Sequence, residues 1–229
     1  MIEIINKLKK YNPLSIFTYG SFATNTQNQN SDVEIGVIFD EENFISNEKL
    51  LKIINNPYYS VFSFKKHELE TYSIDTPFDK NIYIASLILG NAKTIYGEKI
   101  IEKLTPPKLT KQNFLNDTYF NLGYALSAYR IHKAKNIALS NDLLYKSIFY
   151  TTRTLVYIKT KQLISGYNNI YKEGKKLKLD KEYNRLLDLA YTLRNDVAKY
   201  NQSVDGSKFL KDITYINKYV LEVINNSDI

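Results

Sequence analysis

The sequence predicts an α/β (α+β) N-terminal domain with a small mixed sheet, followed by a C-terminal all-α helical bundle. Residues 14–39 contain two bulky apolar runs separated by a Gly-Ser turn and a polar loop, a pattern typical of strands. Beyond Pro106 and Pro107, apolar residues recur at the spacing of amphipathic helices. Because paired prolines disrupt both helix and sheet, we place the N-terminal domain at residues 1–104 and the helical domain at residues 108–229.

The elements of the N-terminal domain follow from the apolar pattern and from the residues that interrupt it. Residues 2–11 are expected to form a helix that Asn12 and Pro13 end. A strand over 14–19 precedes a short helix over 20–24, and an Asn- and Gln-rich loop follows. The remaining predicted elements are strands over 32–39, 58–64 and 93–96 and helices over 47–54, 66–72 and 79–89.

The second half of the chain has the pattern of four helices with short connections, which predicts a bundle. Asn141 with Asp142, and Asp180, are suitable N-cap residues. The predicted helices cover residues 113–135, 142–164, 181–200 and 209–224.

Composition limits the class of protein. The chain has 229 residues, of which 44% are hydrophobic, enough for a substantial core. No apolar run is long enough to span a membrane, and the first residues lack the layout of a signal peptide, so we expect no membrane association. The absence of cysteine excludes disulfides and thiolate metal sites and suits the cytoplasm. The net charge of +7 comes from scattered lysines, which are typical of solvated faces, so a nucleic-acid partner is not expected.

Two acidic residues lie inside the second apolar run. Side chains alternate between the faces of a strand, so Asp32 and Glu34 share one face while Val33 and Ile35 point into a core. Adjacent carboxylates repel each other unless a cation lies between them, and Mg²⁺ prefers such oxygen ligands. Asp32 and Glu34 are therefore the candidate metal ligands. The alternative, an exposed edge strand with solvated acids, is disfavoured by their apolar neighbours.

The Gly-Ser turn completes a candidate phosphate site. Gly20 permits close approach of a ligand to the backbone, and Ser21 offers a hydroxyl and an N–H group to a phosphate. The first N–H groups of the short helix that follows would face the same phosphates. Together with the acidic pair, these residues predict a site for a metal-bound nucleoside triphosphate.

The order Gly20-Ser21, spacer, Ser31-Asp32-x-Glu34 resembles the nucleotidyltransferase signature of the DNA polymerase β superfamily. It is most similar to the antibiotic nucleotidyltransferases of the kanamycin and lincosamide type. The resemblance implies transfer of a nucleoside monophosphate from a nucleoside triphosphate to a hydroxyl of a small antibiotic-like acceptor. ATP is the expected donor. Such a reaction would confer antibiotic resistance. The resemblance also implies Mg²⁺ as cofactor, Asp32 and Glu34 as catalytic ligands, and a homodimer with a shared cleft as one option. Two metal ions could then clamp the attacking and leaving oxygens, with Asp32 bridging the ions and Glu34 completing the cage.

Other family positions do not match. Relatives often carry a third carboxylate on the next strand, where this chain has Ser60. Glu68 and Glu70 follow that strand, but acids at a helix start are also typical of a solvated first turn.

The general base and the phosphate-binding lysine of the kanamycin type are also missing. The base glutamate falls near Tyr124, which leaves Asp117 and Asp142 as alternatives, and we take Asp117 as the catalytic candidate. The lysine falls near Ala128. The candidates for nucleotide binding are then Arg130 and Lys133, which also fit a solvated helix face, and Thr24, at a position often held by Arg.

These departures leave more than one function open. The first is an active Mg²⁺-dependent nucleotidyltransferase with a small hydroxyl-bearing acceptor. The second is a catalytically weakened binding or antitoxin-like module that keeps the fold. Arg194-Asn195-Asp196 is similar to a HEPN ribonuclease motif, but the required His is missing, so RNA cleavage is not expected. Polynucleotide tailing would need a basic groove that the scattered lysines do not locate.

Overall fold

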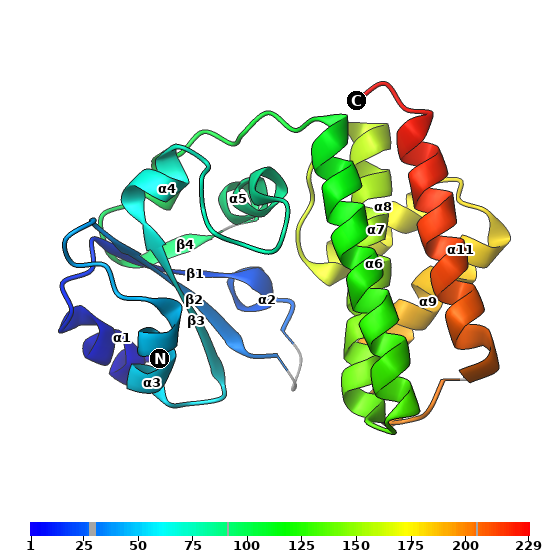
Figure 1. The fold of residues 1–229 in the computed structure, drawn as a ribbon, viewed down its shortest axis with the longest axis horizontal. Coiled ribbons are helices and arrows are strands. Elements are labelled where there is room, and N and C mark those ends of the chain that lie inside the picture. The colour runs from blue at the N-terminus through cyan, green and yellow to red at the C-terminus, as the bar shows by residue number, and fades with distance from the viewer. Residues whose placement is uncertain (28–30, 91, 205) are drawn as a thin grey trace. The chain divides into compact units, whose positions relative to one another are not determined.

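The computed structural model describes residues 1–27, 31–90, 92–204 and 206–229 of the chain. It divides into two compact units, Met1–Lys108 and Leu109–Ile229, which are described separately (Figure 1). The predicted loop after the Gly-Ser turn falls partly outside the described residues, because 28–30 are not among them.

The N-terminal unit is built on a mixed four-stranded sheet with the strand order β3-β2-β1-β4. β1 is antiparallel to both β2 and β4, whereas β2 and β3 are parallel. This confirms the predicted mixed sheet. The strands are β1 (Ser15–Tyr19), β2 (Val33–Phe39), β3 (Tyr59–Lys65) and β4 (Lys93–Gly97).

Helices cover both faces of this sheet (Figure 1). Alternation along β2 sends Ile38 to one face and Val37 to the other, and both are fully buried. Each such side chain contributes about 1.5–3 kcal/mol by burial. The helices are α1 (Ile2–Lys9), α2 (Gly20–Ala23), α3 (Asn47–Ile54), α4 (Lys66–Glu70) and α5 (Lys80–Leu89), with a 3₁₀ turn, η1 (Ile101–Lys103).

The two faces have separate cores. The first face packs against α4, α5 and η1, and its strand residues include Phe17, Ile38 and Phe64. The second face packs against α1 and α3, with Ile35 and Phe39 among its strand residues. The apolar cover of the first face ends toward the start of β2, where Asp32 and Glu34 are only partly buried. The site residues are therefore anchored on a sheet that is packed on both sides.

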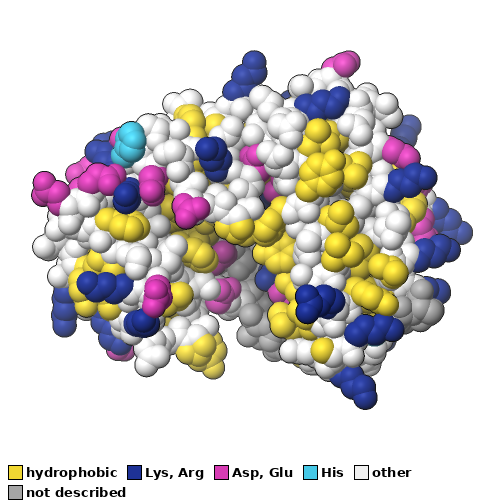
Figure 2. Space-filling view, viewed as in Figure 1, with side chains coloured by type: hydrophobic (Ala, Val, Ile, Leu, Met, Phe, Trp, Pro, Cys, Tyr) yellow, Lys and Arg dark blue, Asp and Glu magenta, His cyan; other side chains and the backbone are white. Residues whose placement is uncertain are grey.

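The C-terminal unit is entirely helical, as predicted, and α6 and α7 are its longest helices. Hydrophobic side chains gather over α6 in Figure 2, and the exposed ones on this helix include Tyr119 and Leu126. The helices are α6 (Lys111–Lys133), α7 (Ile137–Thr160), α8 (Tyr167–Lys176), α9 (Lys181–Asn195), α10 (Val197–Tyr200) and α11 (Gly206–Asn225). In the described part of the chain, no helix combines the length and the apolar character that crossing a membrane requires.

Three predictions for this unit were wrong in detail. α8 was missed because only Ile170 and Gly174 of this helix are buried, too few for a clear apolar pattern. The predicted helix over 181–200 is interrupted at Asp196, which is extended and caps α10. The predicted cap at Asn141 and Asp142 lies inside α7, whose N-cap is Asn136.

Asn141 has a different role from the one predicted. It is fully buried, and its amide donates to the backbone carbonyls of Tyr200 and Gln202, at 2.8 and 2.9 Å. It therefore fixes the segment that ends α10. The predicted cap at Asp180 is confirmed, because its carboxylate accepts from the Tyr183 N–H at 2.8 Å.

Candidate functional site

In the N-terminal unit, the turn formed by Gly20 and Ser21 (the Gly-Ser corner) lies beside β2, the strand that carries Glu34 and follows Asp32. Gly20 follows β1 directly and has a φ of +69°, in the left-handed region that favours glycine. A β-carbon built at Gly20 would lie 1.6 Å from Oε2 of Glu34. The Glu34 carboxylate thus occupies the space that any other side chain at position 20 would need. Both the backbone conformation and the space require glycine here.

Three neighbouring strands contribute one residue each to a row across the sheet. Tyr19 of β1 is the register partner of Glu34 on β2, and Ser60 of β3 is its partner on the other side. Register partners on adjacent strands point to the same face. Asp32, which immediately precedes β2, joins this row because the Ser60 hydroxyl donates a hydrogen bond to its Oδ2. The predicted common face of Asp32 and Glu34 is therefore what the structure shows.

Tyr19 is the most buried member of the row, with 6% of its surface exposed. Its ring lies 5.7 Å from that of Phe17, and its hydroxyl is 3.4 Å from the hydroxyl of Tyr83 on α5. Burial raises the pKa of Tyr19 well above its usual value, and the neighbouring Tyr83, Glu34 and Asp32 raise it further. Tyr19 is therefore a neutral phenol beside the two carboxylates.

The acidic pair is suited to a single cation. No group of three or more His, Cys, Asp or Glu side chains that could hold a metal ion occurs among the residues that the structure describes. Two carboxylates bring two negative charges, which one divalent ion neutralises. Magnesium is usually held by one or two carboxylates together with substrate phosphates, and Asp32 and Glu34 are the residues of this face that could hold a nucleotide-borne ion.

Thr24 forms hydrogen bonds with the backbone of the Gly-Ser corner. Its hydroxyl lies 3.1 Å from the carbonyl oxygen of Gly20 and 3.2 Å from that of Ser21, and 2.8 Å from the hydroxyl of Thr26. The Ser21 carbonyl also accepts from the Thr26 N–H at 2.9 Å. These bonds close the turn that follows α2 and hold Gly20 and Ser21 in place. Thr24 thus lies beside the predicted phosphate-binding residues.

Glu68 and Glu70 do not reach the acidic pair. Both follow the end of β3 that is opposite to Ser60, and five residues of strand span about 16 Å. Glu68 accepts from the Lys65 N–H at 3.3 Å, and Glu70 lies 3.9 Å from the ammonium of Lys66. These contacts agree with a solvated helix start and exclude both residues as a third metal ligand beside Asp32.

In the helical unit, Asp117 is 4% exposed and lies on α6. Its Oδ2 accepts from the Arg153 guanidinium at 3.3 Å and from the Asn121 amide at 3.2 Å. Arg153 comes from α7 and also lies over the ring of Tyr150, 5.1 Å from its centroid. This buried ion pair joins α6 to α7.

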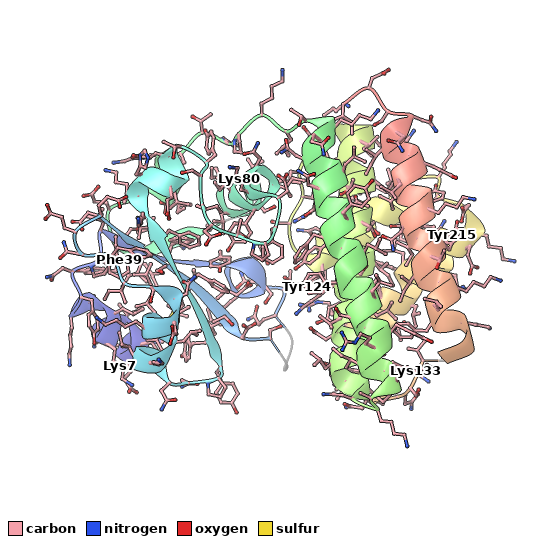
Figure 3. The ribbon with its side chains drawn as sticks, viewed as in Figure 1. Lys7, Phe39, Lys80, Tyr124, Lys133 and Tyr215 are labelled. Carbon is pink, nitrogen blue, oxygen red and sulfur yellow. The ribbon has the colours of Figure 1, made fainter. Side chains whose placement is uncertain are left out.

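Arg130 and Lys133 are distant from Asp117. They follow it by 13 and 16 positions on one helix, which corresponds to about 20 Å or more at 1.5 Å per residue. Lys133 lies at the C-terminal end of α6, whereas Tyr124 is near its middle (Figure 3). Arg130 is exposed, and the ammonium of Lys133 is 5.5 Å from the ring centroid of Tyr129. The structure does not bring these cations together with Asp117.

Sequence reasoning left two residues near predicted sites without a role. Tyr19 directly precedes Gly20, and the alternation of β1 could have placed it on the face of the acids. Arg153 is separated from Asp117 by 36 positions on another helix, so no local pattern indicates their pairing.

Comparisons with known proteins found a family model and a solved structure that are similar to this chain. The family model described as Polbeta: Polymerase beta, Nucleotidyltransferase matches residues 3–99. Among solved structures, the chain is similar to the crystal structure of spectinomycin adenyltransferase AAD(9) from Enterococcus faecialis with ATP and spectinomycin, with a TM-score of 0.59 and 16% sequence identity. The similarity covers 96% of this chain and 99% of the other. No curated protein is significantly similar to this chain in sequence.

The two findings carry different information. At 16% identity, the solved structure shows a shared fold. The family match covers the residues that form the sheet and the acidic row, and it confirms the predicted resemblance. The family match supports an enzyme of the nucleotidyltransferase type. Residues 3–99 of this chain are therefore similar to the nucleotidyltransferase domain of the polymerase β type that this family model describes.

Proposed function

We propose that this protein transfers a nucleoside monophosphate from a nucleoside triphosphate to a hydroxyl of a small molecule, in a Mg²⁺-dependent reaction. One observation carries the proposal. The Glu34 carboxylate lies against the backbone of Gly20, and Asp32 shares its face of the sheet. An uncompensated acidic pair at a glycine corner would be unfavourable, whereas the same pair beside a metal-bound polyphosphate is stabilised.

Asp32 and Glu34 would hold the ion, which, when bound, would neutralise charge on the phosphate oxygens. Gly20 and Ser21 would hold the triphosphate, because the first N–H groups of a helix have no partner within the helix. The rigid sheet below them would keep the α-phosphorus in line with the attacking oxygen, which is most of what phosphoryl-type transfer requires.

The bond changes in this reaction balance simply. The acceptor oxygen forms a bond to the α-phosphorus, and the bond from that phosphorus to the bridging oxygen breaks. Pyrophosphate leaves with the bonding electrons, and the hydroxyl proton passes to a base or to water. Tyr19 does not serve as this base, since its raised pKa keeps the phenol protonated. Asp117 stays the predicted base, and its pairing with Arg153 also fits a structural role.

The acceptor is proposed by analogy with the solved structure, whose title names ATP and spectinomycin. We therefore infer that ATP and a polyhydroxylated amine-bearing antibiotic are the first pair to test. Arg130 and Lys133, predicted to contact the nucleotide, keep that role as a prediction, as do a homodimer and a cytoplasmic location.

The test is pyrophosphate release by the full chain with Mg²⁺ and each of the four nucleoside triphosphates. Spectinomycin, kanamycin and lincomycin serve as acceptors, and mass spectrometry detects the nucleotidylated product. We expect release that needs the triphosphate, Mg²⁺ and an acceptor together. Absence of product with every acceptor, in a protein that also fails to bind Mg²⁺ with the triphosphate, would contradict the proposal.

The second candidate function is a binding or antitoxin-like module that keeps the fold without the chemistry. Ser60 favours it, because this residue replaces the third carboxylate of many relatives. Thermal-shift titration separates the two. An enzyme should be stabilised by triphosphate only when a divalent ion is present, and a module without the site should respond to neither.

A further inference from the structure

We propose that Ser60 makes this a one-ion site: its hydroxyl positions the Asp32 carboxylate, and the chain binds a single divalent cation per triphosphate. This inference rests on the proposed nucleotide site and concerns how many ions that site holds.

The position of Ser60 follows from strand register. β2 and β3 are parallel neighbours, and Ser60 is paired with Glu34. Strands lie about 4.8 Å apart, so a carboxylate on this residue would be within reach of an ion bound to Glu34. Ser60 is also the residue that contacts Asp32 directly. The position where a third carboxylate ligand would lie is thus occupied by the neutral side chain of Ser60.

The Ser60 hydroxyl orients the Asp32 carboxylate through a hydrogen bond. The hydroxyl has one proton, and it donates this proton to Oδ2 of Asp32. The bond restricts the rotation of the carboxylate and leaves Oδ1 to a cation. Hydrogen bonds of this kind orient metal ligands and are typically worth a factor of about 10 or more in metal affinity.

The number of protein ligands gives an independent limit on the number of ions. The triphosphate offers oxygens to any ion, but a second ion would also need a protein ligand of its own, and no third His, Cys, Asp or Glu completes a group within the described ranges. The Glu68 carboxylate accepts a hydrogen bond from the Lys65 N–H, at the opposite end of β3 from Ser60. Tyr19, on the other side of Glu34, has a phenol where a carboxylate would be needed to hold a second ion. The row Tyr19, Glu34, Ser60 therefore supplies one anionic ligand, and Asp32 supplies the other.

The experiment counts bound ions. Mn²⁺ is titrated into the full chain with a non-hydrolysable ATP analogue, and free Mn²⁺ is measured by electron paramagnetic resonance. We expect one tightly bound ion in the parent and two in Ser60→Asp. Asn56→Asp is the matched control, because it adds the same charge before β3 and keeps the oxygen that accepts from the Tyr58 N–H. It should bind one ion.

Two further variants test the positioning role. Ser60→Ala should still bind one ion, with an affinity lowered about 10-fold, and Ser60→Thr should restore most of it because it keeps the hydroxyl. In the absence of metal, Ser60→Asp should melt at a lower temperature than the parent, since three carboxylates then repel one another. Mn²⁺ should raise its melting temperature more than that of the parent.

The outcomes are distinct. Two ions in the parent, one ion in folded Ser60→Asp, or unchanged affinity in Ser60→Ala would each overturn the inference while leaving the proposed function intact. No ion in the parent with the triphosphate present would overturn both. The count in the parent needs no variant, so it decides the question even if Ser60→Asp fails to fold.

Discussion

The carboxylate of Glu34 fills the space beside the α-carbon of Gly20, where a β-carbon would lie 1.6 Å from Oε2. Glu34 on β2 therefore leaves no room for any side chain larger than that of glycine at position 20, the first residue after β1. The contact brings an acidic side chain directly against the backbone that would receive the phosphates.

Gly20→Ala should damage both the fold and the site. A positive φ and the overlap with Glu34 should lower the free energy of unfolding by about 1–3 kcal/mol and displace the carboxylate. Urea unfolding and triphosphate binding by calorimetry measure the two effects. Gly123→Ala is the matched control, because a β-carbon there meets nothing within 4 Å and a helix interior favours alanine by about 0.5–1 kcal/mol. Equal behaviour of the two variants would refute this explanation.

Asp32→Asn and Glu34→Gln should each abolish metal-dependent function while preserving shape. Loss of one anionic ligand should reduce pyrophosphate release by about 100-fold or more. Asp40→Asn is the charge control: Asp40 follows the far end of β2, where its carboxylate accepts from the Asn43 N–H at 2.8 Å. It should keep the parental rate. Parental rates in both site variants would show that the reaction does not use this acidic pair.

Asp117→Asn distinguishes structure from catalysis in the helical unit. If Asp117 only holds Arg153, breaking this buried pair should lower the free energy of unfolding by about 3 kcal/mol, with a modest change in turnover at a temperature where the protein is folded. If Asp117 is the base, turnover should fall by about 100-fold or more and the pH dependence of kcat should lose its acidic limb. Turnover, pH profile and urea unfolding of the same preparation decide between the two roles.

Asp180 should make the stability of the helical unit depend on pH. Burial raises the pKa of Asp180, but hydrogen bonds from the Tyr215 hydroxyl and the Tyr183 N–H outweigh it, and the net pKa is lowered from 3.8. A lowered folded-state pKa means that the stabilisation is present above about pH 4 and is lost as the pH falls through the folded-state value.

Asp180→Ala should therefore lower the free energy of unfolding at pH 7 by about 1 kcal/mol, the usual effect of removing an N-cap. At pH 2.5 the difference from the parent should be smaller than at pH 7, because a larger share of the parent molecules then has an uncharged cap. Urea unfolding at both pH values measures this. A difference that stays constant or grows on acidification would contradict the assignment.

Much of the fold could be predicted from the sequence because the relevant signals are local. The two-residue alternation of β2 placed Asp32 and Glu34 on one face, and Ser46 and Asp79 cap helices close to the predicted starts of α3 and α5. Errors arose where the local pattern was weak. α8 buries only two residues, and the run through Asp196 keeps its apolar spacing although the backbone there is extended.

The sequence by itself determined the strands, most of the helices and the common face of the two acids, since periods of 2 and 3.6 residues are properties of short segments. Only the tertiary structure decided that Ser60 lies beside Asp32, that Tyr19 flanks Glu34, and that Asp117 pairs with Arg153. These partners are separated by 15 to 36 positions in the chain. Their contact depends on strand register and helix packing, which arise from the burial of the whole core.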